Sequence, residues 1–391
     1  MNKEIMGIEE FVQKNNITSK KFLIRADFNV PISNGEIVED MRLKAVIPTL
    51  DLLIAGGAKI ILISHIEAED VDLLGQKGMA IVAKYFNEKL NRNVQFVSGD
   101  GVIDDAVESS ISNMKDGEMI LLDNLRINPG EKNNDEDFSK KLAGLADFYV
   151  NEAFSVSHRK HASVVGVPKF LPHFAGIELL NEINSLKTAI NPPHPFVFIL
   201  GGAKFDTKLS LIKKFLDKAD YVILGGALIN DVYKARGYNI GKSLVSDGNI
   251  DISDIVNNEK IILAKDVVVY NAENIDSIYI KKIEDVSDSD VICDLGPSIL
   301  EELKNVISNA KFVLWNGPLG NYEKGFKDQT VACAKLLVES KIKGAIGGGD
   351  TVAAIQNVDK DLDLNLFIST GGGAMIDFLI NESLPGIDAL R

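Results

Sequence analysis

The stretch KIILISH (residues 59–65) contains four apolar residues in a row, which give way to Ser64 and His65. Short β-rich stretches of this kind alternate along the chain with segments of helical period, which is the pattern of a parallel α/β sheet. In such sheets, ligands bind outside the carboxyl ends of the strands. The residues that end each stretch therefore predict what the sheets bind.

The two halves of the chain end their β-rich stretches differently. Polar and charged side chains end the stretches of the first half, which are KFLIRADFN (21–29), KIILISH (59–65), EMILLDNLR (118–126) and DFYVNEAFSVSHR (147–159). Glycines end those of the second half, which are PFVFILGGAK (195–204), DYVILGGA (220–227), VICDLGP (291–297), KFVLWNGPLG (311–320), GAIGGGD (344–350) and LFISTGGGA (366–374). We therefore predict two parallel-sheet domains with different binding tasks.

A segment of helical period separates the two halves. Its apolar residues are spaced three and four apart from about residue 175 to 190, and prolines flank it on both sides. This pattern predicts a helix. We interpret it as a linker between the domains, and the alternative is an ordinary surface helix with prolines in the adjoining turns.

Composition excludes several classes of protein. The net charge of −14 argues against a nucleic-acid or anionic membrane partner. Two cysteines suit a reducing compartment better than a disulfide framework. The first residues, MNKEIMGIEE, lack the basic and apolar regions of a signal peptide. We therefore expect a cytoplasmic protein that binds neither nucleic acid nor a membrane.

The glycine-rich ends of the second half predict a phosphate site. In STGGGAMIDFLI (369–380), three glycines precede a helix, whose unpaired N–H groups would point at an anion. Lys204 and Lys208 lie at the start of another helix. A single Gly-Gly pair can be only a turn, but repeated glycine ends favour a ligand. Neither a G-x-x-x-x-G-K-[ST] run nor a G-x-G-x-x-G run after the first strand of either half is present, which disfavours a P-loop NTPase and a nicotinamide dehydrogenase.

The arginines of the first half predict an anion site made of side chains. Arg25, Arg126 and Arg159 lie in or just after β-rich stretches, and Arg42 lies in the loop-like segment EDMRL. A guanidinium matches the geometry of carboxylate and phosphate and keeps its charge. The alternative is that each arginine pairs with a surface carboxylate. Histidines and cysteines do not have the spacing of a structural zinc site.

Several segments together resemble a known family. They are RADFNVP (25–31), LLDNLR (121–126), HRKHAS (158–163), LGGAKFDTKL (200–209), WNGPLGNYE (315–323), GGGDT (347–351), STGGGA (369–374) and LPGIDAL (384–390). In this order, and spread over nearly the whole chain, they closely resemble the signature segments of the phosphoglycerate kinases.

The resemblance implies a fold and a reaction. It implies two doubly wound parallel-sheet domains, residues 1–174 and 195–370, joined by a helical hinge at 175–194, with residues 371–391 returning to the N-terminal domain. The enzyme would transfer a phosphoryl group between 1,3-bisphosphoglycerate and Mg-ADP, giving 3-phosphoglycerate and ATP. It would act as a monomer whose domains close before in-line transfer.

The resemblance also assigns roles to individual residues. Those implied to bind the glycerate substrate are Asp27, Phe28, Asn29, Arg42, His65, Arg126 and Arg159. Those implied to bind the nucleotide are Lys208, Gly225, Gly296, Glu323, Gly348, Gly349, Asp350, Thr351, Gly371 and Gly373. Arg42, Lys204 and Gly372 would act on the phosphoryl group in transfer, and Asp350 would lie near Mg²⁺.

The implied chemistry agrees with the residues themselves. Transfer from an acyl phosphate needs no protein nucleophile, so the protein must align the reactants and neutralise charge. Arginine, lysine, Mg²⁺ and backbone amides can do so from fixed positions.

The chain departs from the family at one segment. Most members read SHLGRP where this chain reads Ser64-His65-Ile66-Glu67-Ala68-Glu69, so a substrate-binding arginine is missing at Ala68. Losing one charge-assisted hydrogen bond of roughly 1.5–3 kcal/mol would weaken binding by about 10- to 150-fold. Lys160 or Lys77 could supply the missing charge, and the acids at 67–72 could be a solvent-facing loop.

Two other functions remain open at this point. A paralogue with a weakened or altered substrate preference is favoured by the changed segment at residues 65–69. A non-catalytic nucleotide-binding protein is disfavoured because Arg42, Lys204 and Asp350 are all present.

Overall fold

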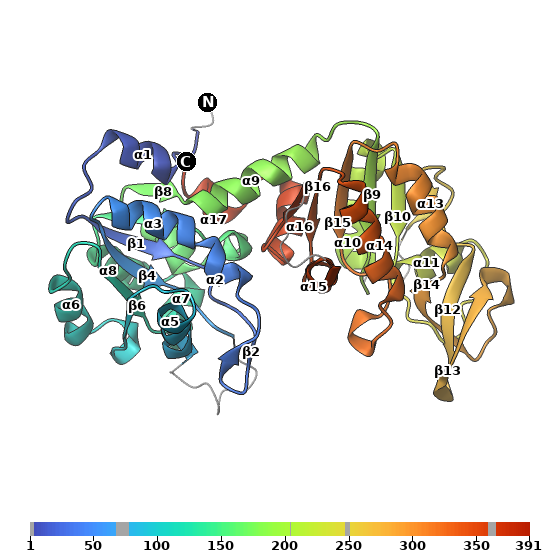
Figure 1. Ribbon diagram of the computed structural model, residues 1–391, viewed down its shortest axis with the longest axis horizontal. Helices are drawn as coiled ribbons and strands as arrows, with labels where there is room; N and C mark the ends of the chain where they lie inside the picture. The colour runs from blue at the N-terminus through green and yellow to red at the C-terminus, as the bar shows by residue number, and fades with distance from the viewer. Residues whose placement is uncertain (1–3, 68–77, 204, 247–250, 359–364) are drawn as a thin grey trace. The chain divides into compact units, whose positions relative to one another are not determined.

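The computed structural model describes residues 4–67, 78–203, 205–246, 251–358 and 365–391 (Figure 1). The chain divides into two compact units. Unit 1 comprises Met1–Asn184 together with Ser383–Arg391, and unit 2 comprises Ser185–Glu382. Lys204, Ala68 and Lys77 lie outside the described residues.

Unit 1 is built on a parallel sheet with the strand order β5-β6-β4-β1-β7-β8 in the described part of the chain. Its strands are β1 (Lys21–Arg25), β4 (Lys59–Ile63), β5 (Val94–Val97), β6 (Met119–Leu122), β7 (Phe148–Asn151) and β8 (His173–Ala175). Every neighbouring pair is parallel. The central strands are continuous apolar runs because helices and loops cover both faces of a parallel sheet.

The helices of unit 1 bury these strands. They are α1 (Ile8–Lys14), α2 (Met41–Ala45), α3 (Ile47–Ala55), α5 (Gly78–Glu88), α6 (Asp105–Ser112), α7 (Pro129–Asn133), α8 (Glu136–Gly144) and the C-terminal α17 (Pro385–Asp388). Leu50 and Leu53 of α3 and Phe86 of α5 share one core with Phe22 and Leu62 of the sheet. Burial of such side chains stabilises each by roughly 1.5–3 kcal/mol.

The C-terminal segment belongs to unit 1. The N–H of Gly386 donates to the carbonyl of Ser157 at 2.8 Å. A Cβ at Gly386 would lie 2.7 Å from the Val164 side chain, so only glycine allows this close approach. The C-terminal residues around Gly386 therefore pack against the segment that carries Arg159.

Unit 2 is built on a second parallel sheet, with the order β11-β10-β9-β15-β16-β17 among the described strands. The strands are β9 (Phe196–Leu200), β10 (Tyr221–Leu224), β11 (Ile261–Ile262), β15 (Phe312–Asn316), β16 (Gly344–Gly347) and β17 (Leu366–Ile368). All neighbouring pairs are parallel. These two sheets confirm the predicted α/β class.

The strand order of unit 2 indicates where a ligand would bind. From β9 the chain moves to β10 and β11 on one side, and from β15 it moves to β16 and β17 on the other. Right-handed crossovers then place α10 (Phe205–Lys218) and α14 (Asp328–Ser340) on opposite faces. Consistent with this, α14 packs against α13 (Ser298–Ile307) and α15 (Gly349–Val358), whereas α10 packs against α16 (Gly373–Asn381). The direction reverses between β9 and β15, where ligands bind in open α/β sheets.

One predicted strand lies in a different sheet. The stretch VICDLGP, expected in the parallel sheet, forms β14 (Asp290–Leu295) of an antiparallel sheet with β12 (Asp266–Asn271) and β13 (Asn274–Lys282). A two-residue connection can join only antiparallel strands, so β12 and β13 form a hairpin, and β14 pairs antiparallel with the other edge of β12. Two β-rich runs flanking an asparagine-rich turn, VVVYNAENIDSIYI (267–280), are the signal that could have shown this.

The other α-helices and strands of the described residues are α9 (Ile177–Ile190), α11 (Leu228–Ala235), α12 (Ser253–Val256) and the small β2–β3 hairpin (Ile32–Ser33, Glu36–Ile37). The helix predicted at 175–190 is α9, and the division between the units falls within it. Its first turn is tied to unit 1, because Leu179 donates its N–H to Glu152 at 3.1 Å. Burial raises the pKa of the Glu152 carboxyl to about 7. The domain bounds and the hinge role stay predictions.

Candidate active site

Four adjacent strands of unit 1 end in the predicted substrate residues. In the sheet order, β6 leads to Arg126, β4 to His65, β1 to Asp27 and Asn29, and β7 to Arg159. Because the carboxyl ends of parallel strands lie along the same sheet edge, the topology gathers residues that are up to 132 positions apart in the sequence.

Asp27, Asn29 and Arg42 form one hydrogen-bonded group at this edge. Arg42 Nη1 lies 3.1 Å from Asp27 Oδ2 and donates to the Asn29 carbonyl at 2.7 Å. Ser155 donates its hydroxyl to the same Asp27 oxygen at 2.5 Å. Arg42 was expected in a loop but lies in helix α2, which is too short to give a periodic signal in the sequence.

His65 is buried and held neutral. It accepts a hydrogen bond at Nδ1 from Arg25 Nη2, 3.1 Å away, so its proton lies on Nε2. Burial lowers the pKa of His65 well below its ordinary value, and the nearby charges of Arg25, Arg126 and Arg159 lower it further. His65 therefore offers an N–H donor near neutral pH.

Arg25 was expected among the anion-binding arginines, but the structure shows it as a buried structural residue. It is fully buried, and its Nε donates to the Ser163 hydroxyl at 2.9 Å. Ser163 in turn donates to the buried carboxylate of Glu131 at 2.6 Å. These hydrogen bonds hold the Arg25 side chain in place, and Arg25 in turn fixes the orientation of the His65 ring.

Arg126 is the strongest indication of a ligand in unit 1. Its side chain is only 6% exposed, and its Nη2 atom is buried with no hydrogen-bond partner in the described part of the chain. Burial, followed by repulsion from Arg159 and Arg25, lowers its pKa to about 10, so it remains a cation at neutral pH. An unpaired buried guanidinium N–H is costly, and an anionic ligand would satisfy it.

Glu67 contacts this arginine cluster. Its carboxylate is hydrogen-bonded to Arg126 Nη1 and lies 3.8 Å from Arg159 Nη1. The idea that residue 67 belongs to a loop facing only solvent is therefore wrong. The pairing joins three separate strand ends, and no local pattern in the sequence signals it.

Two predicted contributors do not gather at this edge. The Phe28 side chain is fully buried, with its ring centroid 5.3 Å from that of Phe86, so it belongs to the core. Lys160 is exposed and lines a surface hollow together with Lys169 and Asp388. The structure gives no contact between Lys160 and the arginines in the described residues.

Five adjacent strands of unit 2 end in glycines. In the sheet order β10-β9-β15-β16-β17, the glycines that follow are Gly225 and Gly226, Gly201 and Gly202, Gly317, Gly348 and Gly349, and Gly371 to Gly373. Backbone contacts connect them: Gly201 donates to the Asn316 carbonyl at 2.9 Å, and Gly226 donates to that of Leu319 at 2.8 Å. The edge of this sheet is therefore made of backbone.

Lys208 lies at the reversal point between β9 and β15. Its Nζ donates to the Gly201 carbonyl at 2.5 Å and lies 3.5 Å from Asn316 Oδ1. Burial lowers the pKa of this ammonium to about 8. A half-buried cation among neutral dipoles is well suited to a phosphate oxygen. The predicted partner Lys204 lies outside the described residues, so their common face is not described.

Two acids and a hydroxyl lie beside the β15 and β16 ends. Burial raises the pKa of Asp350, and the charge of the nearby Glu323 raises it further. The Thr351 hydroxyl oxygen is buried without a partner in the described residues. These oxygen donors are of the kind that Mg²⁺ and ribose hydroxyls use.

The first residues of helix α16 are not crowded by neighbouring atoms. Gly372 precedes it with φ 52° and ψ −119°, a backbone conformation that favours glycine. No atom would meet a Cβ within 4 Å at Gly349, Gly372 or Gly373. A ligand can therefore approach the first amides of the helix closely.

Gly225 and Gly296 differ in position. Gly225 lies at the glycine edge, where a Cβ would come 2.8 Å from the Leu319 backbone. Gly296 follows β14 of the antiparallel sheet, where a Cβ would come 2.2 Å from Asp266 Oδ1. Packing alone thus explains why Gly296 is a glycine.

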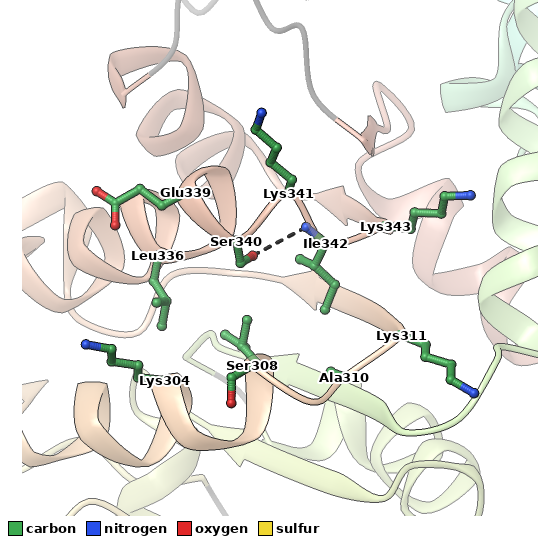
Figure 2. A pocket seen from close by; sticks show the side chains of 11 residues that line it. Lys304, Ser308, Ala310, Lys311, Leu336, Glu339, Ser340, Lys341, Ile342 and Lys343 are labelled. Atoms are coloured by element: carbon green, nitrogen blue, oxygen red, sulfur yellow. Dashed lines mark hydrogen bonds between the residues drawn. The ribbon is translucent and has the colours of Figure 1, made fainter.

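A hollow of about 550 Å³ lies at the opposite end of the unit 2 sheet, where β15 and β16 begin. Lys304, Lys311, Lys341 and Lys343 surround it, and Figure 2 shows their ammonium groups pointing outwards in different directions. Because these ammonium groups point away from one another, they would not bind one ligand together. The glycine edge is therefore the candidate site. The described residues contain no group of three or more histidine, cysteine, aspartate or glutamate side chains that could hold a metal ion. None of the described helices has both the length and the apolar character that a membrane span requires.

Comparisons with known proteins show which family the chain belongs to. The model of the family described as Phosphoglycerate kinase matches residues 12–382. A phosphoglycerate kinase of Coprothermobacter proteolyticus is 37% identical over 96% of both chains, and one of Dictyoglomus turgidum is 39% identical over 96% of both. The structure of phosphoglycerate kinase from Coxiella burnetii superimposes with a TM-score of 0.82 at 31% identity, covering 99% of both chains. The chain belongs to the phosphoglycerate kinase family.

Proposed function

We propose that this chain catalyses reversible phosphoryl transfer from 1,3-bisphosphoglycerate to Mg-ADP, giving 3-phosphoglycerate and ATP. The observation that carries the proposal is the buried cation cluster around Arg126, whose Nη2 has no acceptor in the described residues. A small, multiply charged anion satisfies such a cluster. The glycine edge of unit 2 provides the complementary nucleotide site.

In unit 1, each polar group has a role that its environment supports. Asp27 and Asn29 would hold the hydroxyl and carboxylate region of the glycerate. His65 would donate from Nε2, and Arg126 and Arg159 would bind the anionic end. Phe28 would contribute only through its backbone, because its side chain lies in the core.

In unit 2, backbone groups do most of the binding. Lys208, Gly348, Gly349 and Thr351 would contact the nucleotide phosphates. The further nucleotide contacts proposed are Glu323 to the ribose, Gly225 and Gly296 to the adenosine, and the amides of Gly371 and Gly373 to the transferred group.

The chemical step needs charge neutralisation rather than a nucleophile. Arg42 from unit 1, and Lys204 and the Gly372 amide from unit 2, would stabilise the phosphoryl group in transfer. Asp350 would hold Mg²⁺, mainly through the nucleotide phosphates, and the metal would neutralise phosphate charge. The cytoplasmic location and the monomeric state stay predictions.

Steady-state kinetics with ATP and 3-phosphoglycerate tests the proposal, with 1,3-bisphosphoglycerate followed through a coupled reduction. We expect turnover by the wild type and a KM for 3-phosphoglycerate raised about 10- to 100-fold in Arg126→Gln, at an unchanged KM for ATP. Arg92→Gln is the control, because Arg92 forms an ion pair with Asp51 elsewhere on unit 1. Absence of turnover in a protein that Mg-ATP stabilises would support the non-catalytic alternative.

A further inference from the structure

An acidic side chain of the protein itself binds the arginines of the candidate substrate site. Glu67 Oε1 pairs with Arg126 Nη1, and the same oxygen lies 3.8 Å from Arg159 Nη1. The Arg126 side chain is 6% exposed, whereas that of Glu67 is 53% exposed. The carboxylate therefore reaches the buried Arg126 and the partly exposed Arg159 from the solvent side, which is the side from which a ligand enters.

The backbone holds Glu67 in this place. Its N–H donates to Asn29 Oδ1 at 2.8 Å, and Asn124 Nδ2 donates to the Ile66 carbonyl at 2.9 Å. Two strand ends thus fix the chain on either side of the Ile66–Glu67 peptide. An accidental surface ion pair lacks such anchoring, and its side chains exchange readily with water.

The ion pair leaves the cluster only partly satisfied. Arg126 Nη2 still has no acceptor in the described residues, and Arg25 and Arg159 add further positive charge nearby. One carboxylate does not neutralise these groups. A ligand with two or more negative charges would gain more from the cluster than Glu67 does.

We propose that Glu67 is an internal competitor for the anionic group of the substrate and thereby sets the affinity of the site. When a phosphate monoester or carboxylate of the substrate binds, the Glu67 carboxylate leaves Arg126 and Arg159 and turns to solvent. Weakly charged anions fail to displace it, and multiply charged ones succeed. This inference rests on the proposed function, because it takes the Arg126 cluster as the substrate site.

The test is the KM for 3-phosphoglycerate in Glu67→Gln, together with direct titration of 3-phosphoglycerate by calorimetry. Removing the negative charge should lower both the KM and the Kd about three- to tenfold, since ion pairs of this exposure are modest. The inhibition constant of inorganic sulfate should fall by a similar factor. Glu67→Gly, which also removes the side chain's bulk, should give the same direction.

Glu136→Gln is the matched control. Glu136 is 71% exposed and pairs with Lys140 at 2.6 Å on a helix of the same unit. The same loss of one charge there should leave the KM for 3-phosphoglycerate unchanged. An equal fall in both variants would show a general effect of net charge and overturn the proposal.

Other outcomes separate the competing explanations. A raised KM in Glu67→Gln would mean that Glu67 supports Arg126 structurally, and an unchanged KM would mean that the ion pair is energetically neutral. Either result overturns the proposal. The two failures remain distinguishable: if Arg126→Gln leaves the KM unchanged, the proposed substrate site itself is wrong. If Arg126→Gln raises the KM while Glu67→Gln does not lower it, only the competitor role is wrong.

Discussion

The two sheet edges offer an anion different kinds of chemical group. In unit 1, guanidinium, imidazole and carboxamide groups from four adjacent strands form the edge, whereas in unit 2 glycine backbone forms it. Clustered arginines carry net charge: burial lowers the pKa of neighbouring His161 to about 4, and the charges of Arg126, Arg159 and Arg25 contribute to this shift. Backbone amides carry no net charge, so many of them can surround a polyphosphate without repelling one another.

The comparison teaches that each edge is vulnerable to a different kind of substitution. A side-chain site is weakened by truncating one side chain, and the fold survives because the strand beneath is unchanged. A backbone site is weakened by adding a Cβ, whose effect depends on what the new atom meets. The predictions below use this difference.

The largest effect is expected from Gly317→Ala. Gly317 has φ +90°, and a Cβ there would lie 2.4 Å from the Gly201 carbonyl oxygen. Conformational strain and overlap together should lower the free energy of unfolding of unit 2 by about 3 kcal/mol. Urea unfolding followed by the fluorescence of Trp315, a buried residue of β15, measures this loss.

Gly237→Ala is the control for backbone strain alone. Gly237 has φ +85°, but no atom lies within 4 Å of the added Cβ. We expect a loss of about 1 kcal/mol. Equal losses in both variants would show that the close approach of Gly317 to Gly201 contributes nothing.

A smaller effect on binding alone is expected from Gly373→Ala. The Cβ would point into open space at the start of α16, so the fold should tolerate it. Because it obstructs the approach of the transferred phosphate to the helix amides, the Kd for Mg-ATP should rise about tenfold. Gly144→Ala in α8, which also meets no atom within 4 Å, should leave that Kd unchanged. Equal affinity in both variants would contradict the assignment of a ligand to α16.

The smallest expected effect is a change of the Kd for Mg-ADP with pH. It arises because the glycine edge of unit 2 also includes a titrating side chain. Lys208 is a titrating side chain within the backbone edge, with a pKa of about 8. It is cationic below that pH and loses its charge above it, so the Kd for Mg-ADP should rise severalfold between pH 7 and pH 9. Lys208→Arg keeps the charge and should abolish the dependence. A flat profile for the wild type would mean that Lys208 does not contact the nucleotide.

Much of this comparison is already visible in the sequence. KIILISH and STGGGAMIDFLI each combine a strand with the residues that end it, so local pattern predicts both the strand and the edge chemistry. The contrast between strands that end in side chains and strands that end in glycines follows directly from these local patterns. The family resemblance then assigns the individual roles.

What the sequence could not show depends on contacts between distant segments. Arg25 lies in an apolar strand, and only the structure reveals that it orients His65. Glu67 meets Arg126 and Arg159 because three strands lie in one sheet order. The stretch VICDLGP has the composition of a buried parallel strand, and its antiparallel partners lie outside it. In each case the deciding neighbour is remote in sequence.

The most direct test of the account is a crossed calorimetric titration. Arg126→Gln and Gly373→Ala are each titrated with 3-phosphoglycerate and with Mg-ATP. The account predicts that Arg126→Gln loses affinity for 3-phosphoglycerate about 10- to 100-fold and keeps its affinity for Mg-ATP, while Gly373→Ala does the reverse with about a tenfold loss. If either variant lost affinity for both ligands, or for the other ligand alone, the division between a side-chain site and a backbone site would be wrong.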